Sequence, residues 1–220
     1  MQLYVAQDRV LEKDVPTYLN AQHAMAPTMI ALIKSIDVNK PEESTRIITE
    51  LLAIYRALDS DFRKVLVKHL LTLDASQRKT FFKNLKKENE ETHDRLKENQ
   101  TDRYHERMEY FIGDLTPAQA KMLTPHEQIF LERDRERLIR RKIFQAKIKD
   151  ILERKDDTRE KLLLQSFLEY QAESATKIDH LVPFLKDLTK SLTKEQKAHF
   201  EEKRAEILEM IAQFSKTTYE

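Results

Sequence analysis

The sequence predicts an all-α fold, and three observations support this prediction. One glycine and six prolines in 220 residues leave few of the residues on which hairpins and tight turns depend. Good helix formers such as Leu, Lys, Glu, Arg and Gln dominate the remainder. Apolar residues recur at the 3.6-residue period of one helix face. We therefore expect an extended multi-helix bundle or arch, either as one domain over 1–220 or subdivided into 1–113 and 114–220.

The N-terminal part is expected to contain two short helices, near 8–24 and 27–36. Pro16 and Pro27 punctuate these helices, because proline is tolerated in the first turn of a helix but disfavoured further in. This part of the chain should therefore change direction often.

The next segment is expected to form two helices. Pro41 can open the first, whose apolar face runs to Leu58. Asp59 or Ser60 can cap a second, shorter helix that ends before Asp74.

Two long helices are expected in the middle of the chain, over about 74–112 and 125–153. The first has apolar ends, but between Lys86 and Arg103 it offers only Leu96 as a large aliphatic residue, so its middle should be solvated. Gly113, the one glycine, should end this helix in a left-handed conformation. Three shorter helices are expected near 157–172, 174–190 and 193–215.

One motif recurs at three predicted helix starts, with an apolar residue, a capping residue, two further positions and a glutamine. In a capping box the Asp or Thr oxygen accepts a backbone N–H of the first turn, and the glutamine reaches back to the cap amide. Each cap should stabilise its helix by about 1 kcal/mol. Such boxes also arise independently in unrelated helices. The three copies are Leu73-Asp74-Ala75-Ser76-Gln77, Leu115-Thr116-Pro117-Ala118-Gln119 and Leu192-Thr193-Lys194-Glu195-Gln196.

The third copy, in the segment 192–204, resembles the Leu-Thr-x-x-Gln segment of the Spy and CpxP family of periplasmic proteins, which are small helical chaperones and stress regulators of Gram-negative bacteria. The segment 103–119, with 14–18 upstream, resembles an uncharacterised family of helical proteobacterial lipoproteins, and about two thirds of the chain fits that pattern. The lipobox cysteine of such lipoproteins is absent from this sequence, which contains no cysteine.

The resemblance implies a non-enzymatic protein of the bacterial envelope that binds proteins without ATP. It would hold unfolded clients on a concave surface that is partly apolar and partly basic, or act as a stress-linked adaptor. We expect a periplasmic location, with membrane contact only through a lipid anchor, although a cytoplasmic location stays open, as does the oligomeric state. The first alternative is a helical scaffold with one defined protein partner.

A basic stripe provides the second alternative, binding to nucleic acid. Four arginines fall on one side of the expected helix over 125–153, at Arg133, Arg137, Arg140 and Arg141. Such a stripe can hold phosphates or acidic clients. Acidic residues are interleaved with it, however, and the net charge of the chain is only +1, so a solvated helix face is the simpler interpretation.

No catalytic, cofactor or metal site is expected. Glu90-x-x-His93 has the spacing of a di-iron ligand pair, but the similar Asp102-x-x-His105 lies on the same predicted helix and cannot face it across a bundle. The remaining histidines have no paired spacing, and no serine stands in a Gly-x-Ser-x-Gly elbow. The recurring phenylalanines should mostly be core, with a subset lining a binding groove if the molecule is an open arch.

Overall fold

The computed structural model describes residues 10–97, 101–174 and 181–217. The predicted all-α fold is confirmed, because every regular element in this part of the chain is helical. None of the described helices is both long and apolar enough to span a membrane. The elements are a π-helical turn η1 (Val10–Asp14), α2 (Val15–Gln22), a 3₁₀ turn η2 (His23–Met25), α3 (Ala26–Lys34), α4 (Pro41–Thr72), α5 (Ala75–Arg95), α6 (Thr101–Ile112), α7 (Pro117–Glu153), α8 (Arg159–Ser174), α9 (Leu181–Lys190) and α10 (Lys194–Phe214).

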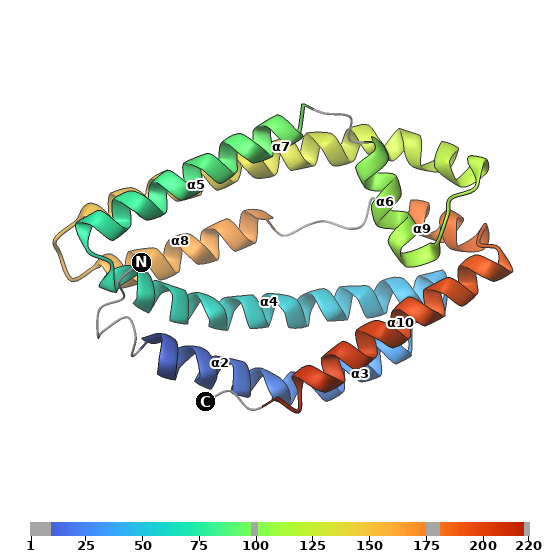
Figure 1. Ribbon diagram of the computed structural model, residues 1–220, viewed down its shortest axis with the longest axis horizontal. Coiled ribbons are helices and arrows are strands. Elements are labelled where there is room, and N and C mark those ends of the chain that lie inside the picture. Colours follow the sequence, from blue (N-terminus) through green and yellow to red (C-terminus); the bar gives the residue numbers. More distant parts are fainter. Residues whose placement is uncertain (1–9, 98–100, 175–180, 218–220) are drawn as a thin grey trace.

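The helices surround an elongated open centre (Figure 1). Helices α5 and α7 run together along one long side, and α4 runs along the other. Outside α4 lie α2, α3 and α10, whereas α6 and α9 close one end of the molecule. Helix α8 packs against both α4 and α7 and fills the centre at the opposite end. The molecule is therefore an arch closed on itself rather than a solid bundle.

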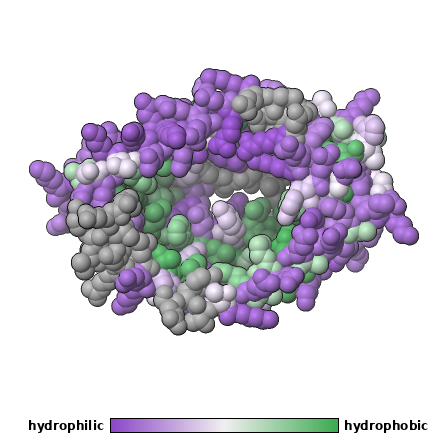
Figure 2. Space-filling view, in the orientation of Figure 1, coloured by the Kyte–Doolittle hydropathy of each residue, from purple (hydrophilic) through white to green (hydrophobic). Residues whose placement is uncertain are grey.

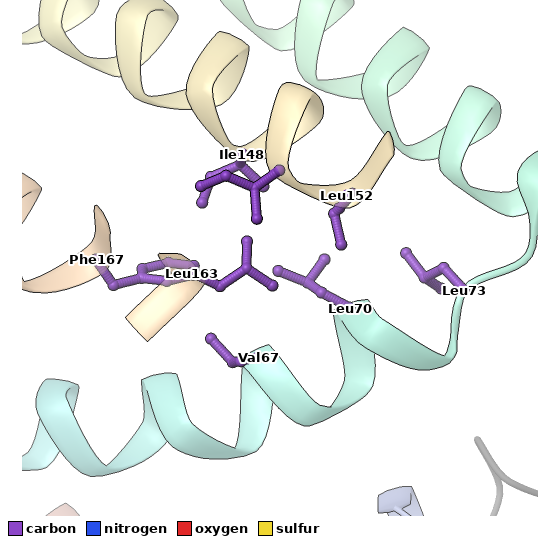
Figure 3. Close-up of a cluster of buried hydrophobic side chains, with 8 residues drawn as sticks. Val67, Leu70, Leu73, Ile148, Leu152, Leu163 and Phe167 are labelled. Carbon is purple, nitrogen blue, oxygen red and sulfur yellow. The ribbon is translucent and has the colours of Figure 1, made fainter. Parts of the chain in front are cut away.

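Two clusters of buried apolar side chains hold the two ends. Figure 3 shows the first cluster, where α4, α7 and α8 converge beside the start of α5. The second cluster joins α6, α7 and α9 with the loops that precede α4 and α10. Each cluster combines residues from both sides of position 113, so each end is packed across that point of the chain. Their buried members are Val67, Leu70, Leu73, Ile148, Ile151, Leu152, Leu163 and Phe167 in the first, and Val38, Tyr104, Ile112, Leu123, Phe184, Leu188 and Leu192 in the second.

The expected continuous helix over 74–112 is wrong. Helix α5 ends at Arg95, and α6 begins at Thr101 and leaves in a different direction (Figure 1). Leu96, the lone aliphatic side chain of the polar middle, is only 4% exposed. A straight helix would have left this side chain in its solvated middle, whereas a turn at Leu96 lets the chain bury it. Gly113 ends α6 as predicted, with φ of 76°.

The second long helix begins earlier than predicted. Helix α7 starts at Pro117 behind the Thr116 cap and passes through Pro125, the residue at which the prediction began it. A proline inside a helix removes one backbone hydrogen bond and costs about 3 kcal/mol. Burial of neighbouring side chains such as Leu123, which is 1% exposed, offsets this cost.

The predicted helix break at Asp59 or Ser60 is also wrong, because α4 runs unbroken from Pro41 to Thr72. Instead of capping a helix, the Asp59 carboxylate forms an ion pair with Arg63 one turn later. Arg63 also donates a hydrogen bond to the Phe167 carbonyl oxygen of α8, at 2.9 Å. The side chain that suggested a helix start therefore orients a buried arginine that joins α4 to α8.

Candidate functional site

All three copies of the recurring motif begin a helix with a capping box. The glutamine N–H donates to the cap oxygen, and the cap N–H donates to the glutamine Oε1. The latter distance is 3.0 Å at Asp74, 2.9 Å at Thr116 and 3.0 Å at Thr193. The leading leucines differ in what they join, because Leu73 belongs to the first apolar cluster whereas Leu192 belongs to the second and Leu115 packs against it.

Two of the three copies meet in space. The side chains of Gln119 and Gln196 donate to each other reciprocally, with Nε2–Oε1 distances of 2.8 Å in both directions. Gln119 also donates to the Ser191 carbonyl oxygen at 3.1 Å, and Gln196 to that of Asp114 at 2.7 Å. Both glutamines are buried, at 1% and 5% exposed. We call this pair the glutamine clasp, and it ties the start of α7 to the start of α10.

The clasp could not be predicted from the sequence, which indicates only the local capping role of each glutamine. A capping glutamine on a helix surface and one buried against a second helix start have the same sequence pattern, so the pattern does not show which of them is buried. One feature of the sequence indicated that these two helix starts share surroundings. Each has a large apolar residue eight positions after its leading leucine, Leu123 in one and Phe200 in the other. Leu123 is a buried member of the second cluster and Phe200 packs against it.

The open centre is hollowed, and hydrophobic residues gather around it. Figure 2 shows them lining a central opening, whereas most residues on the outer rim are hydrophilic. We call this inner surface the central hollow. A contiguous apolar surface that remains accessible in a folded protein often marks a binding site.

One wall of the central hollow is a row of α7 side chains. His126 contacts the Phe184 ring of α9, with ring centroids 4.6 Å apart, and Phe144 stacks on Tyr170 of α8 at 4.5 Å. Residues spaced three and four apart between His126 and Phe144 lie on the same face of α7. This face spans the gap between α9 and α8. The residues on it in the gap are Arg133, Arg137 and Arg140.

Three arginines of the predicted stripe thus stand on this face of α7, whereas the fourth, Arg141, contacts α5. Arg141 donates to Thr92 Oγ1 of α5 at 2.9 Å, so it joins two helices. Arg137 lies 3.2 Å from an Asp134 carboxylate oxygen, and Arg140 lies 3.4 Å from one of Glu136. A phosphate backbone would have to displace these carboxylates. Nucleic-acid binding stays a prediction, and it requires affinity that falls steeply with salt and weakens when Arg137 and Arg141 become glutamate.

The opposite wall of the hollow is α4. Arg63 and Val67 face α8, and Leu52 stands on the same face because it precedes Arg63 by eleven residues, about three turns. Near the end of α8, Gln171 donates to the Arg56 carbonyl oxygen at 3.1 Å. Leu52 is half-buried, precedes Arg56 by about one turn and, by this helical repeat, lies on the α4 face that α8 covers further along.

Tyr104 shows how polar groups are held beside the second cluster. Its hydroxyl donates to an Asp134 carboxylate oxygen at 3.1 Å, and its ring packs on Phe130. Burial, with the Asp134 charge and this hydrogen bond, raises the pKa of Tyr104 to about 12. The phenol is therefore strongly held in its neutral form.

The histidine and carboxylate pairs of the sequence are used separately. His93 and Glu90 are exposed on α5. The His105 ring nitrogen lies 3.2 Å from a Glu127 oxygen, which joins α6 to α7, while the side chain of Asp102 lies outside the described residues. Among the described side chains, no group of three or more His, Asp or Glu residues converges as metal ligands would.

Comparisons with protein-family models, with curated proteins and with solved structures found no match to this chain. The fold and the inner surface therefore define the protein by architecture, as a closed arch of helices with an accessible apolar and basic centre.

Proposed function

We propose that this is a non-enzymatic, protein-binding protein of the bacterial envelope that holds unfolded or partly folded clients without ATP. The observation that supports the proposal is the hydrophobic lining of the central hollow in Figure 2. Placement in the envelope rests on the resemblance of the Leu-Thr-x-x-Gln segments to the Spy and CpxP family. Fractionation of cells that make the protein tests that placement.

The two walls of the hollow suit an unfolded polypeptide. Leu52 and its apolar neighbours can take hydrophobic side chains, which unfolded chains expose and folded proteins bury. Across the hollow, guanidinium groups at Arg133, Arg137 and Arg140 can bind carbonyl oxygens and carboxylates, and their planar faces can stack on aromatic rings. Because such contacts need no defined client sequence, the surface is suited to binding many different clients rather than one.

Suppression of aggregation of several unrelated unfolded proteins, without ATP, tests this proposal. We expect the wild type to act at a near-stoichiometric ratio and the Leu52→Glu, Arg137→Glu double variant to be much weaker. Ala53→Glu, which adds a carboxylate at an exposed position next to Leu52 on α4, is the control for the Leu52→Glu change, which alters the net charge equally. Inactivity of the wild type against all clients, or an equal loss in the control, would contradict the proposal.

One observation favours a second candidate, an adaptor with a single defined partner. Ile139 and Ile143 stand one turn apart on α7 and are 58% and 65% exposed. Two large aliphatic side chains on an uncovered helix face resemble the anchors by which a helix enters a partner's groove. In that case Ile139→Asp, Ile143→Asp would abolish capture of one particular protein while aggregation suppression is retained.

A further inference from the structure

A groove between α5 and α7 lies on a different face of α7 from the arginine row. It has a volume of about 880 Å³ and runs along α5 from Ala75 to Glu90. Fifteen helical steps make this run about 22 Å long. Its α7 wall contains Lys142, Ala146 and Lys149, none of which belongs to the row that borders the central hollow. The groove is therefore a separate surface from the proposed client site.

The floor of this groove is apolar. Phe82 and Leu85 of α5 are half-buried there, and Ala146 opposite them is small enough to leave the space between the helices open. Asn89 bridges the two helices at one end by donating to Gln145 Oε1 at 2.6 Å. A hydrocarbon chain laid between these helices would bury apolar surface on both sides.

The rim of the groove is cationic. Six lysine and arginine residues line it against two glutamates. The two glutamates are already engaged, Glu90 with Lys86 at 3.7 Å and Glu153 with Lys149 at 3.8 Å. Arg78 donates to the Leu73 carbonyl oxygen. The cations that remain are Lys79, Lys83 and Lys142, which are exposed and have no ion pair with any carboxylate of the described residues.

Lys79 and Lys83 lie one turn apart on the same face of α5, an arrangement of like charges that destabilises a helix slightly. An anion placed between them would relieve this repulsion. The lysine stems meanwhile extend the apolar walls, because their methylene groups can cover hydrocarbon while the ammonium groups stay in water. Head and tail of one ligand would thus be recognised by neighbouring parts of the groove.

We propose that the α5–α7 groove binds a single-chain amphipathic anion of the long-chain carboxylate class. The carboxylate lies between Lys79 and Lys83, and the hydrocarbon chain runs along Phe82 and Leu85 toward Ala146. Lys142 lies beyond the chain, near the end where Asn89 bonds to Gln145. Charge complementarity selects the anionic head, and the narrow floor selects one chain. The volume falls within the range of about 300–1,000 Å³ that is usual for small-molecule sites.

Fluorescence of a dansyl-labelled undecanoate, titrated with the full-length protein below the probe's micelle concentration, tests this proposal. We expect saturable binding that hexadecanoate displaces, whereas hexadecanol, acetate and inorganic phosphate displace it weakly. Displacement by hexadecanol as strong as by hexadecanoate would show adsorption to apolar surface alone. Displacement by acetate or phosphate would show binding of a bare anion. Either result overturns the proposal.

Substitutions in the groove test whether the probe binds there. Lys79→Glu, Lys83→Glu should weaken binding several-fold, since each exposed charge pair contributes a fraction of a kcal/mol. Ala146→Phe, which fills the floor and keeps every charge, should weaken it as well. The control Lys121→Glu, Lys216→Glu changes two exposed lysines outside the groove by the same net charge. Circular dichroism verifies that each variant is folded.

The proposal is overturned if the control weakens binding as much as Lys79→Glu, Lys83→Glu, or if Ala146→Phe has no effect. It is also overturned if an acidic peptide displaces the probe while hexadecanoate does not, because the groove would then take polypeptide. Loss of probe binding in Leu52→Glu, with the groove variants unchanged, would place the ligand in the central hollow instead. The groove result does not depend on whether the protein suppresses aggregation.

Discussion

The two ends of the arch are closed by different physics. Where α4, α7 and α8 meet, closure rests on aliphatic and aromatic side chains such as Leu163, which is wholly buried, and Leu152. Where α7 meets α10, a buried pair of amides, the glutamine clasp, lies beside apolar residues. Hydrophobic packing tolerates changes of shape, whereas a reciprocal amide pair requires both partners in place. One repeated motif therefore caps helices at both ends of the arch but cross-links two helix starts at only one of them.

The largest effect is expected at the apolar end. Leu163→Ala should lower the free energy of unfolding by about 2–5 kcal/mol, because it removes a fully buried side chain and leaves a cavity. Urea unfolding followed by circular dichroism measures this loss. Leu168→Ala on the same helix is the control, since Leu168 is 57% exposed. Equal losses in the two variants would show that α8 is not packed as described.

A smaller but more informative effect is expected at the clasp. Gln119→Ala or Gln196→Ala should each cost about 1–3 kcal/mol, because each removes a capping side chain and takes away two of the hydrogen bonds of the other buried amide. The double variant should cost less than the sum, so a double-mutant cycle should give a coupling energy between the two glutamines.

The third copy of the motif provides the control for this cycle. Gln77 is half-buried and caps α5, and Gln77→Ala combined with Gln196→Ala should be additive because the two lie at opposite ends of the molecule. Additivity of Gln119→Ala and Gln196→Ala instead would mean that the clasp does not stabilise the fold.

The smallest effect is confined to alkaline pH. The pKa of Tyr104 is raised in the fold to about 12 from its ordinary value of 10.0, so the neutral phenol is favoured by folding. The stability that it contributes is therefore complete below pH 10 and is lost as the pH rises from 10 through 12. Tyr104→Phe should lose less stability than the wild type over this interval, as measured by urea midpoints at pH 8 and pH 11.5.

Absorbance of tyrosinate gives the direct reading. In the wild type Tyr104 should titrate late, with a pKa of about 12, and Tyr104→Phe should reduce the late component, to which Tyr18, whose pKa burial also raises, contributes as well. A titration without a late component in the wild type would contradict the contact with Asp134.

Much of the fold could be predicted from local pattern. Capping residues and the single glycine mark helix ends by backbone chemistry that acts within one turn, and these signals located the starts of α5 and α10 and the end of α6. The capping box at Thr116 also marks the true start of α7, although the helix was expected to begin at Pro125. The errors arose where a local signal was outweighed by burial. Asp59 was interpreted as a cap, Pro125 as a helix start and Leu96 as part of a straight helix. Instead, Asp59 pairs with a buried arginine, Pro125 lies inside α7 and Leu96 is buried at a turn.

The helical character of the chain, most helix ends and the capping glutamines could be predicted from the sequence, because these properties depend on residues within a few positions of one another. The pairing of Gln119 with Gln196, the position of Arg133, Arg137 and Arg140 on the α7 face between α9 and α8, and the groove shared by lysines of α5 and α7 emerge only in the folded chain. Those outcomes depend on the relative placement of helices distant in sequence. Helical periodicity fixes which residues share a face, but not which face another helix will cover.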